Sequence, residues 1–203
     1  MDKIGVVLGG APSLPEHLKL IPENAILFGV NYHASLLIDC DYIVFNDPVD
    51  YSHLNGKKVS RFRELSDIYY DSPVGQNSAI VAARFALEIG CNPVILAGIE
   101  LYQGDGYFHD LERTNRGHNL PLNQQLKEWE AVPKKKVKAI DGPLVEVFGK
   151  VEEIKPESKY MTIDVHTAKT VHIDSRTSIN FVVGIQKMPR EKAEAALNAG
   201  IAT

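Results

Sequence analysis

The chain alternates short, wholly apolar runs with longer stretches in which apolar residues recur at helical spacing. The runs at residues 4–8 and 25–30 predict strands that are buried on both faces of a sheet. Further strands are predicted at residues 42–45, 59–62, 94–97 and 137–140. Helices are predicted at residues 13–20, 32–38, 76–89, 123–132 and 143–148, and a loop at residues 64–76. Because strand and helix alternate over residues 1–148, we expect a doubly wound α/β structure with a mostly parallel sheet.

Two of these helices carry terminal signals. The helix at residues 76–89 ends before Gly90, a residue typical of helix C-termini. The helix at residues 13–20 begins at Ser13, with Glu16 three residues later, which is the spacing of a capping box.

The pattern changes after Gly149. Residues 150–159 are charged and linker-like, and residues 160–187 alternate apolar and polar side chains, which predicts antiparallel strands. Residues 189–199 predict an Ala-rich helix that ends at Gly200. We therefore expect a domain at residues 1–150 and a small β-plus-helix module at residues 151–203. The module is too small for a large core, so it must dock or form a homo-oligomer.

Composition narrows the class of protein. The net charge of −4 argues against unspecific nucleic-acid binding. No apolar run approaches the ~18 residues that span a membrane, and Met1-Asp2-Lys3 does not begin a secretory signal. Cys40 and Cys91 lie in apolar surroundings and form no CxxC pair, which predicts buried free thiols in a reducing compartment. These features predict a cytoplasmic protein.

A glycine-rich turn follows the first predicted strand. Gly9 and Gly10 lead directly into the helix that begins near Ser13, and backbone amides in such a turn can bind an anion. The segment is neither GxGxxG nor a Walker A loop. The alternative is a tight turn with a capping serine.

Polar residues also follow the second and third predicted strands. Asn31, Asn46 and Asp47 stand at these ends, which share one edge with the glycine turn in a parallel sheet. Amide groups there can read a base or a ribose, or they can simply terminate strands. The helix at residues 76–89 would point its N-terminus at the same crevice. Its first residues, Gln76, Asn77 and Ser78, either bind a ligand there or simply cap the helix.

The loop after the strand at residues 94–97 holds the richest chemistry. Tyr102 and Tyr107 can hydrogen-bond a phosphate without metal, and His118 can act as a general base. His118 can equally be a surface histidine, and His109 beside Asp110 is a second candidate base.

Carboxylates in the same loop leave a metal site open. Glu100, Asp105 and Asp110 could hold a divalent cation together with phosphates. The other histidines show no shared spacing and no zinc pattern, and we interpret them as surface or packing residues: His17, His33, His53, His166 and His172.

Four segments in this order resemble a known family. They are GGAPSL at residues 9–14, FGVN at 28–31, VFND at 44–47, and AGIELYQGDGYFHD at 97–110 followed by RGH at 116–118. The series resembles bacterial sialyltransferases of glycosyltransferase family 42, and a wider Rossmann-like group of motility accessory factors and phage proteins. The resemblance covers residues 4–148 and implies a Rossmann-like domain.

The resemblance also implies roles for single residues. His118 matches a general base for the acceptor hydroxyl, and Tyr102 and Tyr107 match tyrosines that stabilise the departing phosphate. The family enzymes use a CMP-linked sialic acid and need no metal. Asn31 and Asn46 match asparagines of the nucleotide site. Gly10 and Ser13 fall in the phosphate-side loop, and Ser78 falls near the start of the sugar-binding helix.

We therefore expect a metal-independent, glycosyltransferase-like enzyme that takes a pyrimidine nucleotide sugar and an acceptor hydroxyl. Two alternatives stay open. One is a magnesium-dependent pyrophosphokinase or phosphotransfer enzyme, in which Asp47, Asp105 and Asp110 hold the metal. The other is a phage or prophage structural or assembly protein that keeps the fold without catalysis and works through its C-terminal module.

Overall fold

The structure is a computed structural model. It describes residues 3–72, 77–101, 106–111 and 120–152, and then residues 160–165, 169–172, 178–181, 184–189 and 197–200. The chain divides into two compact units, Met1–Lys155 and Pro156–Thr203.

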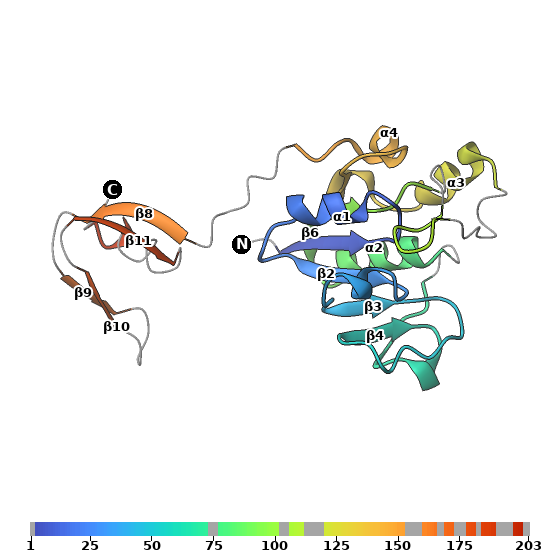
Figure 1. Ribbon diagram of the computed structural model, residues 1–203, viewed down its shortest axis with the longest axis horizontal. Helices are drawn as coiled ribbons and strands as arrows, with labels where there is room; N and C mark the ends of the chain where they lie inside the picture. The colour runs from blue at the N-terminus through green and yellow to red at the C-terminus, as the bar shows by residue number, and fades with distance from the viewer. Residues whose placement is uncertain are drawn as a thin grey trace. The chain divides into compact units, whose positions relative to one another are not determined.

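The first unit is built on a seven-stranded sheet in which every described pairing is parallel (Figure 1). The strands are β1 (Lys3–Leu8), β2 (Ile26–Val30), β3 (Tyr42–Val44), β4 (Lys57–Ser60), β5 (Ile68–Tyr69), β6 (Cys91–Ala97) and β7 (Val137–Ala139). Their order in the sheet is β5-β4-β3-β2-β1-β6-β7. The sheet thus grows outward in both directions from β1, and β1 and β6 flank the switch point at which such folds bind ligands.

Helices cover both faces of this sheet. They are α1 (Leu14–His17), which continues as a 3₁₀ turn over Leu18–Leu20, α2 (Ser78–Glu88), α3 (Leu122–Trp129) and α4 (Leu144–Phe148). Short 3₁₀ turns lie at Ala34–Leu36, Arg63–Leu65 and Lys134–Lys136. This arrangement confirms the predicted doubly wound α/β class.

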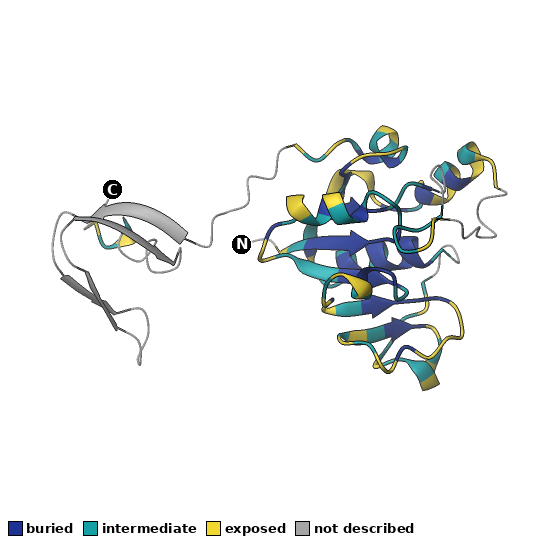
Figure 2. Ribbon diagram, in the orientation of Figure 1, coloured by how far each residue is buried: buried dark blue, intermediate teal, exposed yellow. Residues whose placement is uncertain are grey.

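Alternation along β1 explains why its sequence is wholly apolar. Val7 joins the core cluster that contains most of α2, whereas Val6 and Leu8 join the cluster that contains Leu14 of α1. A strand that is covered on both faces has no position for a polar side chain. Figure 2 shows the central strands buried and the exposed residues at the periphery.

The polar side of the sheet differs from the prediction. β4 begins at Lys57, two residues before the predicted strand. The prediction missed these two residues because both are lysines, which carry no apolar pattern, and Lys57 is exposed. β5 lies inside the predicted loop at residues 64–76. It has only two residues, Ile68 and Tyr69, which is too few for a period to be seen.

The predicted capping box at Ser13 is wrong. Ser13 has φ −72° and ψ −14°, which is helical rather than extended, and its side chain makes no capping hydrogen bond. Its backbone N–H instead donates to the Glu100 carboxylate at 3.2 Å. α1 has only four residues and continues after His17 as a 3₁₀ turn.

The second unit contains antiparallel pairs, as predicted. β8 (Tyr160–Val165) pairs with β11 (Gly184–Pro189), and β9 (Lys169–His172) pairs with β10 (Ser178–Phe181). Pro189 belongs to β11 and not to the predicted helix at residues 189–199. Of that helix, the structure describes residues 197–199, of which 197 and 198 are helical.

Both cysteines are buried and free, as predicted. Burial raises the pKa of the Cys40 thiol to about 11 and also raises that of Cys91. In the part of the chain that the structure describes, no helix is long and apolar enough to cross a membrane.

Candidate functional site

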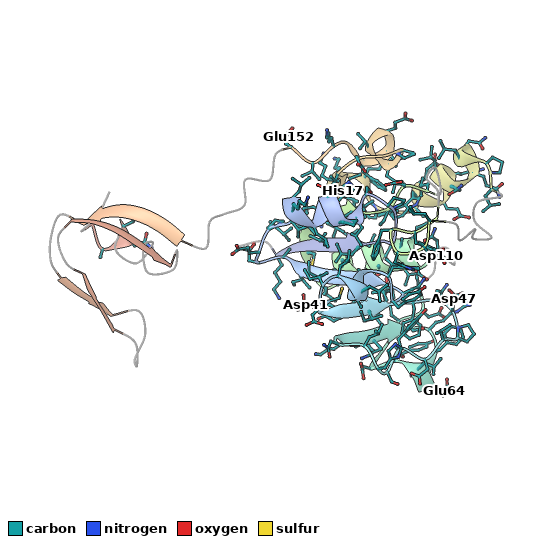
Figure 3. The ribbon with its side chains drawn as sticks, viewed as in Figure 1. His17, Asp41, Asp47, Glu64, Asp110 and Glu152 are labelled. Atoms are coloured by element: carbon teal, nitrogen blue, oxygen red, sulfur yellow. The ribbon has the colours of Figure 1, made fainter. Side chains whose placement is uncertain are left out.

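A cavity of about 520 Å³ opens at the carboxyl edge of the sheet. Its walls are the segments that follow β1, β2, β3 and β6, the start of α2, one side of α3 and the segment around Tyr107. Figure 3 shows Asp47 and Asp110 at this edge. The cavity therefore sits where the strand order predicts a ligand.

The glycine turn after β1 forms the floor of the cavity. Ala11 N–H donates to the Gly98 carbonyl at 3.0 Å, which ties the turn to the corner after β6. A Cβ on Gly9 would lie 2.1 Å from the Gly98 oxygen. A Cβ on Gly10 would lie 2.7 Å from His33 Cγ and 2.8 Å from Tyr107 Cδ1. Both glycines are thus required by the close approach of neighbouring groups, and Gly10 lets two rings close over the turn.

Those two rings belong to an aromatic cluster on the cavity wall. The His33 ring stacks on Tyr107 with centroids 4.1 Å apart and an interplanar angle of 22°. His33 Nδ1 lies 2.9 Å from His109 Nε2, within hydrogen-bond distance. His109 in turn lies parallel to Tyr107, at 5.6 Å. The cluster joins the segment after β2 to the segment at residues 106–111.

Asn31 is the first residue after β2 and has a left-handed backbone, with φ +55°. It lines the cavity, and its side-chain Oδ1 is buried without a hydrogen-bond partner among the described residues. Asparagine tolerates this backbone conformation better than most residues. A buried acceptor without a partner costs about 1–3 kcal/mol, which a donor on a ligand would recover.

Ser78 links α2 to the end of β3. Its hydroxyl oxygen accepts a hydrogen bond from the Asn46 backbone N–H at 3.1 Å. Asn77 caps α2, because its side chain accepts from the Ala79 N–H at 2.9 Å. Asp47, Asn77 and Ser78 all line the cavity.

His17 contacts the corner after β6, although the sequence suggested only a surface or packing residue. It is only 4% exposed, and its Nδ1 accepts from the Gly98 N–H at 2.9 Å while its Nε2 lies 2.8 Å from Asp141 Oδ2. Because a backbone N–H can only donate, Nε2 carries the proton and donates to Asp141. One imidazole therefore joins α1 to the residues that follow β6 and β7.

Three carboxylates line the cavity, and they are Asp47, Glu100 and Glu128. Among the lining residues that the structure describes there is no lysine or arginine. Gln125 of α3 also lines it and is held by a bond from its Nε2 to the Leu120 carbonyl at 2.8 Å. The described wall is thus acidic, with neutral amides and rings between the charges.

The structure gathers most of the predicted site residues. Those that line the cavity are Gly9, Gly10, Asn31, Asp47, Asn77, Ser78 and Tyr107. Ser13 and Asn46 do not line it but bond to residues that do. Gln76, Tyr102 and His118 lie outside the described residues, as does Asp105. Asp110 is exposed and does not line the cavity.

Four lining residues with polar side chains had no predicted part in the nucleotide site, and one of them, Glu100, was considered only as a metal ligand: His33, Glu100, Gln125 and Glu128. His33 follows Asn31 by two residues, which is the one signal that could have drawn attention to it. In the described part of the chain, no group of three His, Cys, Asp or Glu side chains could hold a metal ion.

The chain is similar in fold to the sialyltransferase CstII from Campylobacter jejuni, solved with the substrate analogue CMP-3FNeuAc. The TM-score is 0.51 at 14% identity, covering 98% of this chain and 99% of that one. A structure of the sialyltransferase CST-II with a trisaccharide acceptor and CMP gives a TM-score of 0.52 at 13% identity, covering 99% and 100%. No protein-family model and no curated protein matches the sequence. The fold likeness agrees with the resemblance that the sequence motifs indicated.

Proposed function

We propose that the protein is a glycosyltransferase that transfers a sugar from a cytidine nucleotide to an acceptor hydroxyl without a metal ion. The observation that carries the proposal is the buried Oδ1 of Asn31 in the cavity wall, which has no hydrogen-bond partner among the described residues. The 4-amino group of cytosine can donate to this oxygen, whereas the 4-oxo group of uracil cannot. Likeness in fold to sialyltransferases solved with CMP or a CMP-sugar analogue supports the same donor class.

The chemistry follows from the residues around the cavity. As the acceptor oxygen bonds to the anomeric carbon, the bond from that carbon to the phosphate oxygen breaks and leaves its electron pair on the phosphate. Tyr107, which lines the cavity, would donate a hydrogen bond to this phosphate. The motif resemblance assigns the second such bond to Tyr102 and the removal of the acceptor proton to His118.

The first test is a thermal-shift panel with CMP, UMP, cytidine, ATP and CMP-sialic acid, each in EDTA and in magnesium. A ligand that binds the native state raises the melting temperature by mass action. We expect stabilisation by CMP in EDTA and weaker stabilisation by UMP. Stabilisation by ATP only with magnesium would instead favour phosphotransfer, and no shift with any ligand would favour an assembly role.

A matched pair of variants tests the role of Asn31. Asn31→Gly tolerates the left-handed backbone and removes the acceptor, so CMP affinity should fall about 5- to 100-fold, towards that of UMP. Asn31→Asp keeps an acceptor and should retain the preference for cytosine over uracil. Equal CMP and UMP affinities in the unmodified protein would contradict the proposed readout. For the chemistry, His118→Ala should abolish transfer while CMP still binds.

A further inference from the structure

The cavity poses an electrostatic problem for any phosphate ligand. Asp47, Glu100 and Glu128 line it, and no lysine or arginine does so among the described lining residues. One of these carboxylates, Glu100, already accepts the Ser13 N–H. A nucleotide that enters would place further negative charge near carboxylates of the same sign, and a positive charge beside the phosphate would offset this repulsion.

The His33–His109 pair is placed to supply that charge. His33 lines the cavity and is 6% exposed, and its Nδ1 lies 2.9 Å from His109 Nε2. A hydrogen bond between two imidazoles needs one nitrogen that carries a proton and one that carries a lone pair. The pair can therefore be neutral or carry one extra proton with its hydrogen bond intact. A second extra proton would leave two donors facing each other and break the bond.

Burial of His33 and a phosphate in the cavity would act in opposite directions on a positive charge on the pair. Burial disfavours a charge on His33 while no anion is present. Among the described residues, the ionisable groups around the pair include Tyr32, whose ring packs on both histidines, Tyr107, which stacks on His33, and Asp110, next to His109 in the chain. The Gly10 backbone and the edge-on Phe108 ring also pack against the pair.

We propose that the His33–His109 pair takes up one proton from solvent when the nucleotide phosphate binds, and thereby supplies the cation that neutralises the leaving phosphate. The inference rests on the proposed function, because it concerns the phosphate of the same nucleotide. When the bond from the anomeric carbon to phosphate breaks, the electron pair stays on the phosphate oxygen beside the imidazolium. The proton lost by the acceptor hydroxyl goes to a different group, His118, so the two proton movements are separate.

Isothermal titration calorimetry of the full chain tests this. CMP is titrated at pH 7.5 in two buffers of different ionisation enthalpy, which gives the number of protons taken up on binding, and cytidine serves as the matched ligand without a phosphate. We expect CMP binding to take up about half a proton or more and cytidine binding to take up none. His109→Phe and His33→Phe should each abolish the uptake and weaken CMP more than cytidine.

Two control variants assign the proton. His53→Phe removes an exposed histidine that does not line the cavity, and it should leave the uptake unchanged. His118→Phe should also leave it unchanged. If His33→Phe fails to fold, His109→Phe and His109→Gln carry the test. The inference alone is overturned if CMP binds without taking up a proton. It is also overturned if the proton uptake survives in the His33 and His109 variants and is lost in His118→Phe. If neither CMP nor cytidine binds, the proposed function falls and the inference falls with it.

Discussion

Replacement of His17 by Leu should destabilise the first unit substantially, although His17 touches no ligand. The leucine fills a similar volume but leaves the Gly98 N–H without its acceptor in a buried position. An orphaned buried N–H costs about 1–3 kcal/mol. Loss of the bond to Asp141 adds less than about 1 kcal/mol, because the Asp141 side chain is 51% exposed and water can replace it. The expected loss in free energy of unfolding is therefore about 1–4 kcal/mol.

Two further variants separate the bonds. His17→Asn can still offer an oxygen to the Gly98 N–H and should recover part of the lost stability. Asp141→Ala removes only the exposed partner and should cost little. Urea unfolding gives the three free energies, and native-state hydrogen exchange of the Gly98 amide reports the bond directly, since that amide should exchange faster in His17→Leu. The reasoning is refuted if Asp141→Ala costs as much as His17→Leu, or if His17→Asn is no better than His17→Leu.

Three other predictions concern the same unit. Gly10→Ala should lower the free energy of unfolding, measured by calorimetry, by about 1–3 kcal/mol, since its methyl group meets the His33 and Tyr107 rings. Gly90→Ala, whose methyl group would have nothing within 4 Å, should cost only about 1 kcal/mol for its positive φ. Equal costs would contradict the packing argument. Asn77→Ala should lower the free energy of unfolding, measured in urea, by about 1 kcal/mol because the helix cap is lost. Asn77→Asp should keep the cap but weaken CMP binding. Equal loss of stability in both variants would show that the cap is not the cause. Burial raises the pKa of the Cys40 thiol from its ordinary value of 9.0 to about 11, so its contribution to stability is complete below pH 9 and is lost as the pH rises towards 11. Cys40→Ala should therefore reduce the alkaline fall in the free energy of unfolding, measured in urea, by up to about 1.4 kcal/mol per pH unit. An unchanged slope would refute this.

The sequence predicted the sheet well where burial is complete. β1 from Ile4 and β6 from Val94 are apolar because both of their faces are covered, so composition locates these parts, whereas residues 91–93 of β6 lie outside the predicted strand. β4 and β5 were shifted or missed because the outer part of the sheet is partly exposed, and exposed strand positions accept lysine or tyrosine. Burial of the strand, and not its strand propensity, therefore decided whether the apolar pattern predicted it.

The cavity was predictable to the extent that topology decides it. Parallel strands end at one edge, so the polar residues after β1, β2 and β3 had to meet there. The contacts of His17 and His33 were not predictable from local patterns, because their partners are distant in sequence. Gly98 lies 81 residues from His17, and His109 lies 76 residues from His33. A histidine with no local signal acquires its role only from such long-range partners.

The place of β1 between β2 and β6 has a consequence for biosynthesis. β1 is made first and pairs early with β2, but its other neighbour, β6, follows it by roughly 90 residues (Val6 pairs with Ile95). At about 5–20 residues per second, an apolar strand edge stays unpaired for roughly 5–20 s on the nascent chain. Such an edge is a template for unwanted pairing with other chains. Aggregation during synthesis should therefore be most sensitive to changes that delay or weaken the Cys91–Ala97 strand, even where the finished protein is stable.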